Sequence, residues 1–232
     1  MIALALRADI ERYAAAMRHQ NPLFTRAERG TLAAEHLVRY LANIRVLIMH
    51  TEPHLMRAIV RARGLADFAL ATHYKKKLGE EAGHEQWAER DVEQVSAMVA
   101  RAVPQDRARS LDELVDFIES TIDEDPALYL SYMLFAEYLI VLMGPEWLLH
   151  LETRCGIPRS SMTVIGNHAE LDREHSEEAF EMIDELVVDP RKLPAMRRVL
   201  AQTVALFDRF STEVVAQGDE ARYAASVRAP AA

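Results

Sequence analysis

Glycine, proline and cysteine are scarce in this chain of 232 residues, which contains eight, nine and one of them respectively. So little glycine and proline excludes collagen-like and low-complexity disordered chains. The single cysteine, Cys155, excludes an intramolecular disulfide and a structural zinc site built on thiolates. Basic residues are outnumbered by acidic ones, and the net charge of −9 argues against nucleic acid or an anionic membrane as the main partner.

Long apolar runs are missing as well, because charges interrupt each run before the roughly 20 residues that a membrane-spanning helix needs. The N-terminal sequence has no basic leader followed by a cleavage site. We therefore expect a soluble, cytoplasmic protein. Half of its residues are hydrophobic, enough for the core of one globular domain. We expect this domain to span residues 1–217, followed by a C-terminal tail, residues 218–232.

Helical periodicity fills the chain, whereas strand patterns are almost absent. Asn21-Pro22, Pro53 and the segment 155–158 predict breaks between helices. Ser110 with Glu113 predicts a capping box at the start of one helix. The sequence thus predicts an all-α protein of seven or eight helices. The expected helices cover about 6–19, 31–50, 53–64, 66–102, 110–122, 126–155, 159–187 and 194–217.

Glu81 and His84 form the first segment that suggests chemistry. A spacing of three residues puts a carboxylate and an imidazole on one helix face, where both can reach one metal ion. Taken alone, such a pair is more often a solvated surface pair. Glu80 stands four residues before His84, which also suits a shared ligand, and we prefer Glu81 because of the motif pattern described below.

His168, Asp172 and His175 form the second segment. Their i, i+4, i+7 spacing makes one stripe over two helical turns, and all three side chains are good ligands for first-row metals. Facing a core, the stripe would bury three polar side chains at a cost of a few kcal/mol each if unpaired. The pattern therefore favours metal binding or catalysis over a structural role.

Glu137 is the third candidate, because it is the only charge in the apolar stretch 129–143. Apolar residues surround it on every side of the helix, so we expect the carboxylate to point inward. An isolated ionised group is costly there, and a bound cation is a common remedy. The alternative is a lone glutamate on a narrow exposed stripe.

Together the candidates supply three carboxylates and three imidazoles. Oxygen and nitrogen donors in this ratio suit iron or manganese, and six ligands suit two metal ions better than one. The predicted catalytic and metal-binding residues are Glu81, His84, Glu137, His168, Asp172 and His175.

Several of these motifs resemble those of the heme-oxygenase-like diiron oxidases and oxygenases, relatives of heme oxygenase, TenA proteins and the oxidase of pyrroloquinoline quinone synthesis. The most specific match is Gly156-Ile157-Pro158 ahead of the stripe on 168–175. Glu81-x-x-His84 about 50 residues before a lone helical Glu137 is also similar. Further similarity lies in Asn21-Pro22-Leu23-Phe24, Gly30-Thr31-Leu32 and Tyr40-Leu41, although a histidine often stands at the place of Asn21.

The resemblance implies a heme-oxygenase-like bundle of about seven helices that holds two iron ions, with manganese as the other choice. It implies an O2-dependent oxidase or oxygenase acting on a small organic metabolite, of an amino-acid or fatty-acid-like kind. An external electron donor is an expected partner. We also expect a homodimer, from the resemblance and from apolar residues of the last helix, namely Val199, Val204, Leu206, Phe210 and Val214.

Three alternatives remain open. A ferritin-like diiron site would use Glu52 as its first carboxylate, but it would leave His168 without a role. A metal-free TenA-like protein of the same fold would bind or transform a small heterocycle. A heme protein would take its axial ligand from His36, His50 or His54.

The remaining polar residues receive structural interpretations. His19, His73 and His150 are expected to be structural, and Lys75-Lys76-Lys77 to be a solvated face. Tyr132 and Tyr138 flank Glu137, where packing is the commoner role of such residues and lining a pocket the other. Gly79 and Gly83 weaken the helix around Glu81 and His84, so we expect that segment to be the more mobile half of the site.

Overall fold

The computed structural model describes residues 1–227, and within them it contains only helices, turns and loops. This confirms the predicted all-α class, although the helices are more numerous than expected. The α-helices are α1 (Ile2–Gln20), α2 (Pro22–Glu28), α3 (Ala34–Met49), α4 (Thr51–Gly64), α5 (Phe68–Glu80), α6 (Glu85–Ser96), α7 (Arg109–Glu124), α8 (Tyr129–Cys155), α9 (Thr163–Leu186) and α10 (Leu193–Val227). Short 3-10 turns are η1 (Pro126–Leu128), η2 (Arg159–Ser161) and η3 (Pro190–Lys192).

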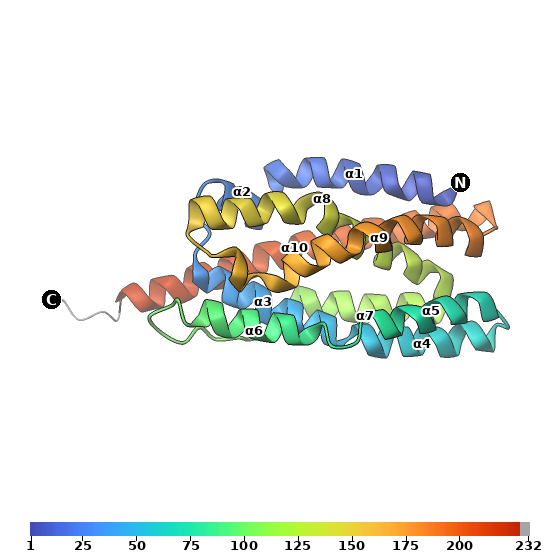
Figure 1. Ribbon diagram of the computed structural model, residues 1–232, viewed down its shortest axis with the longest axis horizontal. Coiled ribbons are helices and arrows are strands. Elements are labelled where there is room, and N and C mark those ends of the chain that lie inside the picture. Colours follow the sequence, from blue (N-terminus) through green and yellow to red (C-terminus); the bar gives the residue numbers. More distant parts are fainter. Residues whose placement is uncertain (228–232) are drawn as a thin grey trace.

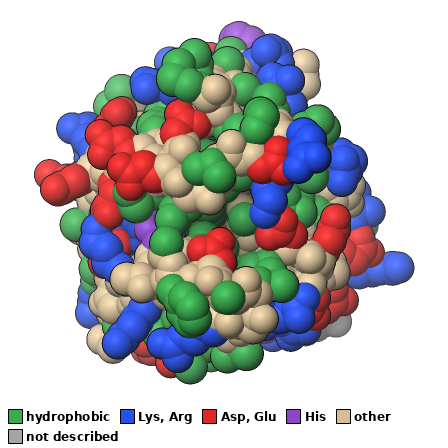
Figure 2. Space-filling view, turned by 90° about the vertical axis from the view of Figure 1, so that its right-hand side faces the viewer, with side chains coloured by type: hydrophobic (Ala, Val, Ile, Leu, Met, Phe, Trp, Pro, Cys, Tyr) green, Lys and Arg blue, Asp and Glu red, His purple; other side chains and the backbone are tan. Residues whose placement is uncertain are grey.

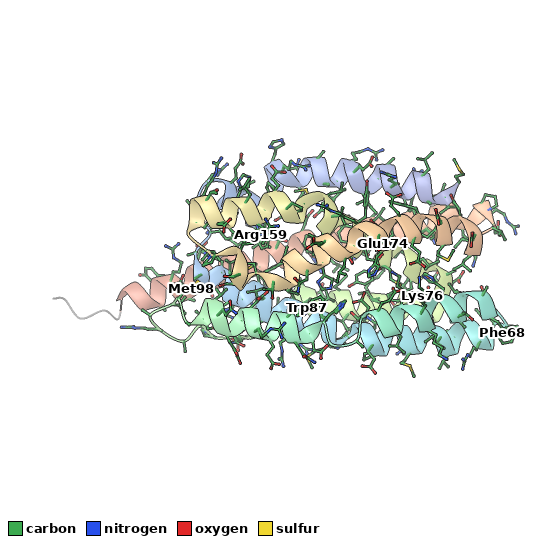
Figure 3. The ribbon with its side chains drawn as sticks, viewed as in Figure 1. Phe68, Lys76, Trp87, Met98, Arg159 and Glu174 are labelled. Atoms are coloured by element: carbon green, nitrogen blue, oxygen red, sulfur yellow. The ribbon has the colours of Figure 1, made fainter. Side chains whose placement is uncertain are left out.

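Two broken helices form one side of the elongated bundle (Figure 1). α3 and α4 are separated at His50, three residues before Pro53, which confirms the predicted break. α5 and α6 return along them, so that α5 packs on α4 and α6 packs on α3. Phe68, the first residue of α5, stands at the end of the bundle where the chain turns back (Figure 3).

The single helix expected over 66–102 is wrong. α5 ends at Glu80, α6 begins at Glu85, and no helix covers 97–102. Gly83 adopts a φ of 89°, in the left-handed region that favours glycine, so the helix is interrupted there. Consequently Glu81 and His84 lie in a turn between two helices and not on a helix face.

α8 runs through the centre of the bundle, as its apolar sequence predicts. Asp125 caps the preceding turn η1 by accepting a hydrogen bond from the Ala127 amide, and Gly156, at a φ of 69°, ends the helix. The segment Pro126–Cys155 is long and apolar enough to cross a membrane by length and composition alone. Most of it is buried among the other helices, which is how the core helix of a soluble protein behaves.

α10 is longer than predicted, because it continues through Gly218 to Val227 instead of ending near 217. Gly218 lies against α3, and a Cβ at this position would stand 2.5 Å from Cδ2 of His36. Glycine is therefore required by close packing of two helices and does not mark a helix end. Residues 228–232 of the expected tail lie outside the described residues.

The predicted capping box at Ser110 is also wrong, since α7 begins at Arg109 with Ala108 as its N-cap. The Ser110 hydroxyl instead donates to Glu213 Oε2 of α10, at 2.5 Å. Both signs of charge lie among hydrophobic side chains over the end face of the bundle (Figure 2), so neither sign dominates this face.

Candidate metal centre

α9 presents the stripe of His168, Asp172 and His175, and a buried carboxylate holds the start of this helix in place. Asp91 of α6 accepts a hydrogen bond from the Thr163 hydroxyl at 2.8 Å and another from the Val164 amide at 2.7 Å. These contacts cap the first turn of α9 and fix it to α6. The same two helices therefore position both histidine-bearing segments of the site.

Glu137 comes from α8, which packs closely on α9. A Cβ placed on Gly144 would stand 3.3 Å from Cβ of Ala169, so the absence of a side chain at 144 allows this approach. Glu137 is 8% exposed, which confirms that its carboxylate is buried as the apolar sequence predicts.

Glu81 and His84 face the cluster from the turn between α5 and α6. Nδ1 of His84 lies 3.1 Å from Oε2 of Glu81. The ring of Trp87 stacks on the His84 ring, with centroids 4.2 Å apart, and it also meets the edge of His168. Trp87 therefore covers this half of the site with an aromatic ring.

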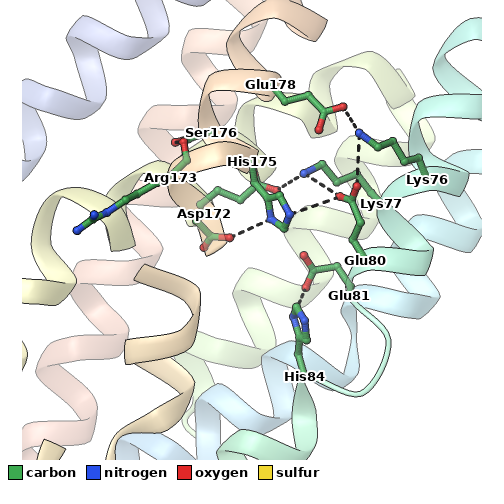
Figure 4. Close-up of polar contacts among 11 residues, drawn as sticks. Lys76, Lys77, Glu80, Glu81, His84, Asp172, Arg173, His175, Ser176 and Glu178 are labelled. Atoms are coloured by element: carbon green, nitrogen blue, oxygen red, sulfur yellow. Dashed lines mark hydrogen bonds and ion pairs between the residues drawn. The ribbon is translucent and has the colours of Figure 1, made fainter. Parts of the chain in front are cut away.

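Donor atoms from five of the six predicted residues form two groups. Glu81, His84 and His168 offer ligand atoms that all lie within 4.8 Å of one another, and so do Glu81, Glu137 and His175. Glu81 belongs to both groups, as a bridging carboxylate would. Asp172 belongs to neither group, and its Oδ1 lies 3.3 Å from Nδ1 of the neighbouring His175 (Figure 4).

Burial favours the neutral form of two imidazoles, His168 and His175. Nδ1 of His168 donates to the Val164 carbonyl at 2.7 Å, which leaves Nε2 with its lone pair free. Burial lowers the pKa of His168 below its ordinary value. Burial also lowers the pKa of His175, and the charge of Lys77 lowers it further.

Burial makes two of the three carboxyl groups, Glu137 and Asp172, harder to ionise. Burial raises the pKa of Glu137 to about 7, even though Lys77 lies beside it. Burial and the neighbouring Glu137 and Glu81 raise the pKa of Asp172 to about 8. Burial would also raise the pKa of Glu81, but His84 and His168 outweigh it, so that this pKa lies below its ordinary value.

Lys77 was missed as a site residue, since the run of three lysines predicted a solvated face. Its side chain is 1% exposed, and Nζ lies 3.1 Å from Oε1 of Glu137. Nζ also lies 3.2 Å from Oε2 of Glu80 (Figure 4). The sequence does carry a signal for this, because Leu70, Tyr74 and Lys77 share one helical stripe and the first two are buried.

Glu80 also lies in the cluster. The sequence analysis preferred Glu81 over Glu80, and the structure places both carboxylates at the site. Oε2 of Glu80 lies 3.9 Å from Nε2 of His175, and Lys76 contacts both Glu80 and Glu178 at the rim. The site therefore holds two further charged residues, Lys77 and Glu80, beyond the predicted six.

A cavity of about 220 Å³ opens directly beside the cluster. Glu81, Glu137, His168 and Asp172 form its polar end, and the rest of its wall is mainly apolar. Tyr132 lines this cavity, whereas the hydroxyl of Tyr138 donates to Glu11 at 2.8 Å and packs structurally.

Residues of the alternative sites lie elsewhere. Glu52, which a ferritin-like site needs, is exposed on α4. His36 contacts Arg26 and Asp219, His50 bonds the Val46 carbonyl, and neither they nor His54 line the cavity. Cys155 lies at the end of α8, with Sγ 3.6 Å from the Ala27 carbonyl.

The apolar residues of α10 that suggested a dimer are mostly used inside the chain. Val199, Leu206, Phe210 and Val214 are buried in the core, so they offer no face to a second copy. The homodimer stays a prediction without this support.

Comparison with known proteins shows the fold. No protein-family model matches the chain, and no curated protein matches its sequence. A domain of unknown function with a heme oxygenase-like fold, from Shewanella denitrificans, is 17% identical with a TM-score of 0.77, and the match covers 92% of each chain. A TenA homolog from Pseudomonas syringae pv. tomato is 14% identical with a TM-score of 0.64, covering 91% of this chain and 93% of that one. The chain therefore has the heme oxygenase-like fold that its motifs predicted.

Proposed function

We propose that the protein is a non-heme diiron oxidase or oxygenase that uses molecular oxygen on a small organic substrate. The observation that carries this proposal is the pair of ligand groups that share Glu81. Within each group, the ligand atoms all lie within 4.8 Å of one another. Three imidazoles and three carboxylates in a buried cluster match the donor preferences of iron and manganese.

The cluster fits a pair of divalent ions in its charge as well as its donors. Oε2 of Glu137 is buried without a hydrogen-bond partner among the described residues, and Oε2 of Glu80 has the ammonium of Lys77, at 3.2 Å, close to it. Buried, unpaired carboxylate oxygens are costly, and the raised pKa values of Glu137 and Asp172 reflect that cost. Positive charge at this point would relieve it.

Each residue has a definite task in this proposal. Glu81, His84 and His168 would hold one ion, and Glu81, Glu137 and His175 would hold the other. Asp172 would orient His175 through Nδ1, and the Val164 carbonyl orients His168 in the same way. Bound here, two iron ions would supply the electrons and the open coordination positions for activating oxygen.

The apolar surroundings would keep water from the site. Trp87 covers the rings of His84 and His168, and the cavity beside them is lined mainly by hydrophobic side chains. A water-excluding site strengthens the electrostatic hold of the carboxylates on their ions and limits side reactions of activated oxygen. An external electron donor remains part of the prediction.

Lys77 favours a second candidate, a metal-free protein of the same fold. Its ammonium already pairs with Glu137 and Glu80, as a counter-ion would in a site without metal. In that case the cavity would bind or transform a small heterocycle, the alternative derived from the sequence.

Oxygen consumption distinguishes the two candidates. Protein loaded anaerobically with ferrous ion is mixed with oxygenated buffer, and oxygen uptake is followed with an electrode. We expect uptake by the wild type, loss of uptake in His168→Ala, and no loss in His19→Ala, which changes an exposed histidine. Uptake that is absent from the wild type, or equal in all three proteins, would favour the metal-free candidate.

A further inference from the structure

The cavity beside the cluster points to the class of substrate. We propose that it binds an elongated, largely apolar molecule with a single polar head group at the cluster, and not a zwitterionic amino acid. The placement of the head group rests on the proposed function, whereas the binding of the apolar part does not.

A stripe of α8 side chains forms one wall of the cavity. Tyr132, Met133, Ala136 and Ile140 recur on one face of this central helix, and all four line the cavity. Ala136 is exposed, and the other three are half-buried, although α8 lies in the middle of the bundle. Their accessible surface therefore faces the cavity.

The other helices complete an apolar enclosure. α3 contributes Ile44, Leu47 and Ile48, and α10 contributes Phe207. Burying apolar surface against such walls is worth about 25 cal/mol for each Å². The space of about 220 Å³ is roughly seven times the ~30 Å³ share of a water molecule in the liquid, which suits a chain of several carbon atoms.

Charged groups that line the cavity are confined to the cluster end and are all acidic or imidazole. Among the lining residues that the structure describes there is no lysine or arginine, and the polar ones away from the cluster are uncharged, such as Thr51 and Thr203. The carboxylate of a zwitterionic head would lie beside Glu81, Glu137 and Asp172 with no lysine or arginine of the cavity wall to pair with it, which costs several kcal/mol. One head group at the cluster avoids that cost.

Binding to metal-free protein tests this proposal apart from the metal function. Calorimetric titration compares 1-octanol, which has one uncharged head, with 2-aminooctanoate, which carries a zwitterionic head on an eight-carbon chain. We expect 1-octanol to bind and 2-aminooctanoate to bind at least about tenfold more weakly. Because no metal is present, a failure here is separate from a failure to bind iron.

Variants locate the binding. Ala136→Phe fills the cavity from α8 and should weaken 1-octanol binding at least about tenfold. Ala15→Phe adds the same ring to an exposed position of α1 and should leave binding unchanged. If Ala136→Phe does not fold by circular dichroism, Ile140→Phe narrows the same wall one turn later. No binding of 1-octanol, equal binding of the two probes, or equal binding by cavity and control variants would overturn the proposal.

Discussion

Lys77 is the residue whose role the sequence hides most. Three consecutive lysines look like a solvated face, yet rotation of about 100° per residue separates them, and only Lys77 lies on the buried stripe. Lys75 and Lys76 are exposed, and Lys76 pairs with Glu178 at the rim. A neighbouring pair of lysines therefore provides an internal comparison of buried and exposed charge.

Lys77→Met should destabilise the metal-free protein by about 3 kcal/mol, because it leaves buried Glu137 and Glu80 without their cation. Manganese ions, which do not start oxygen chemistry readily, should restore much of this loss. Thermal unfolding followed by circular dichroism measures both effects. Lys75→Met is the matched control and should change little; equal destabilisation by the two substitutions would contradict the role of Lys77.

Burial of His54 makes the free energy of unfolding depend on pH. Burial, together with the charges of His50 and Arg57, lowers the pKa of His54 from the ordinary 6.5 to about 4. The folded chain thus binds this proton less readily than the unfolded chain. Its stabilising contribution is present above pH 6.5 and is lost as the pH falls through about 4.

His54→Phe should therefore lose less stability than the wild type between pH 6.5 and about 4, by up to roughly 3 kcal/mol. Urea unfolding at a series of pH values measures the difference. His19→Phe changes an exposed histidine and should follow the wild type. Parallel pH profiles for His54→Phe and the wild type would show that burial of His54 does not resist protonation.

At the scale of elements, the turn between α5 and α6 decides how Glu81 and His84 reach the cluster. Helical spacing correctly predicted that the two side chains lie together, because their contact also forms across this turn. The position of the turn could not be predicted, since glycine within a helical pattern marks either a weak point or a break. Tertiary packing of α5 on α4 and of α6 on α3 selects the break.

Gly83→Ala should lower the free energy of unfolding. The same substitution at a glycine inside a helix would instead raise it. A φ of 89° is strained for alanine, at a cost of about 1 to 2 kcal/mol. Gly79→Ala is the matched control, since Gly79 lies in α5 with open space around a new Cβ and should gain up to about 1 kcal/mol. Urea unfolding of both variants measures the opposite signs; stabilisation by both would place Gly83 in an ordinary helix.

At the scale of the whole molecule, local sequence patterns predicted more of the ligand cluster than of the cavity beside it. The stripe on α9 follows from helical spacing alone, and Glu137 is identifiable because it interrupts an apolar helix. The cavity wall is not identifiable in this way, because Tyr132 and Ala136 look like core packing until α3 and α10 are placed around them. The close contact of Gly218 with His36 likewise depends on residues far apart in sequence.

The central claim, that the cluster holds two metal ions, is tested most directly by counting them. Protein is loaded anaerobically with ferrous ion, passed through a desalting column, and analysed for iron per chain by mass spectrometry. We predict about two equivalents in the wild type and in His19→Ala, whose histidine is exposed, and loss of bound iron in His175→Ala. Two equivalents retained by His175→Ala, or none bound by the wild type, would contradict the account.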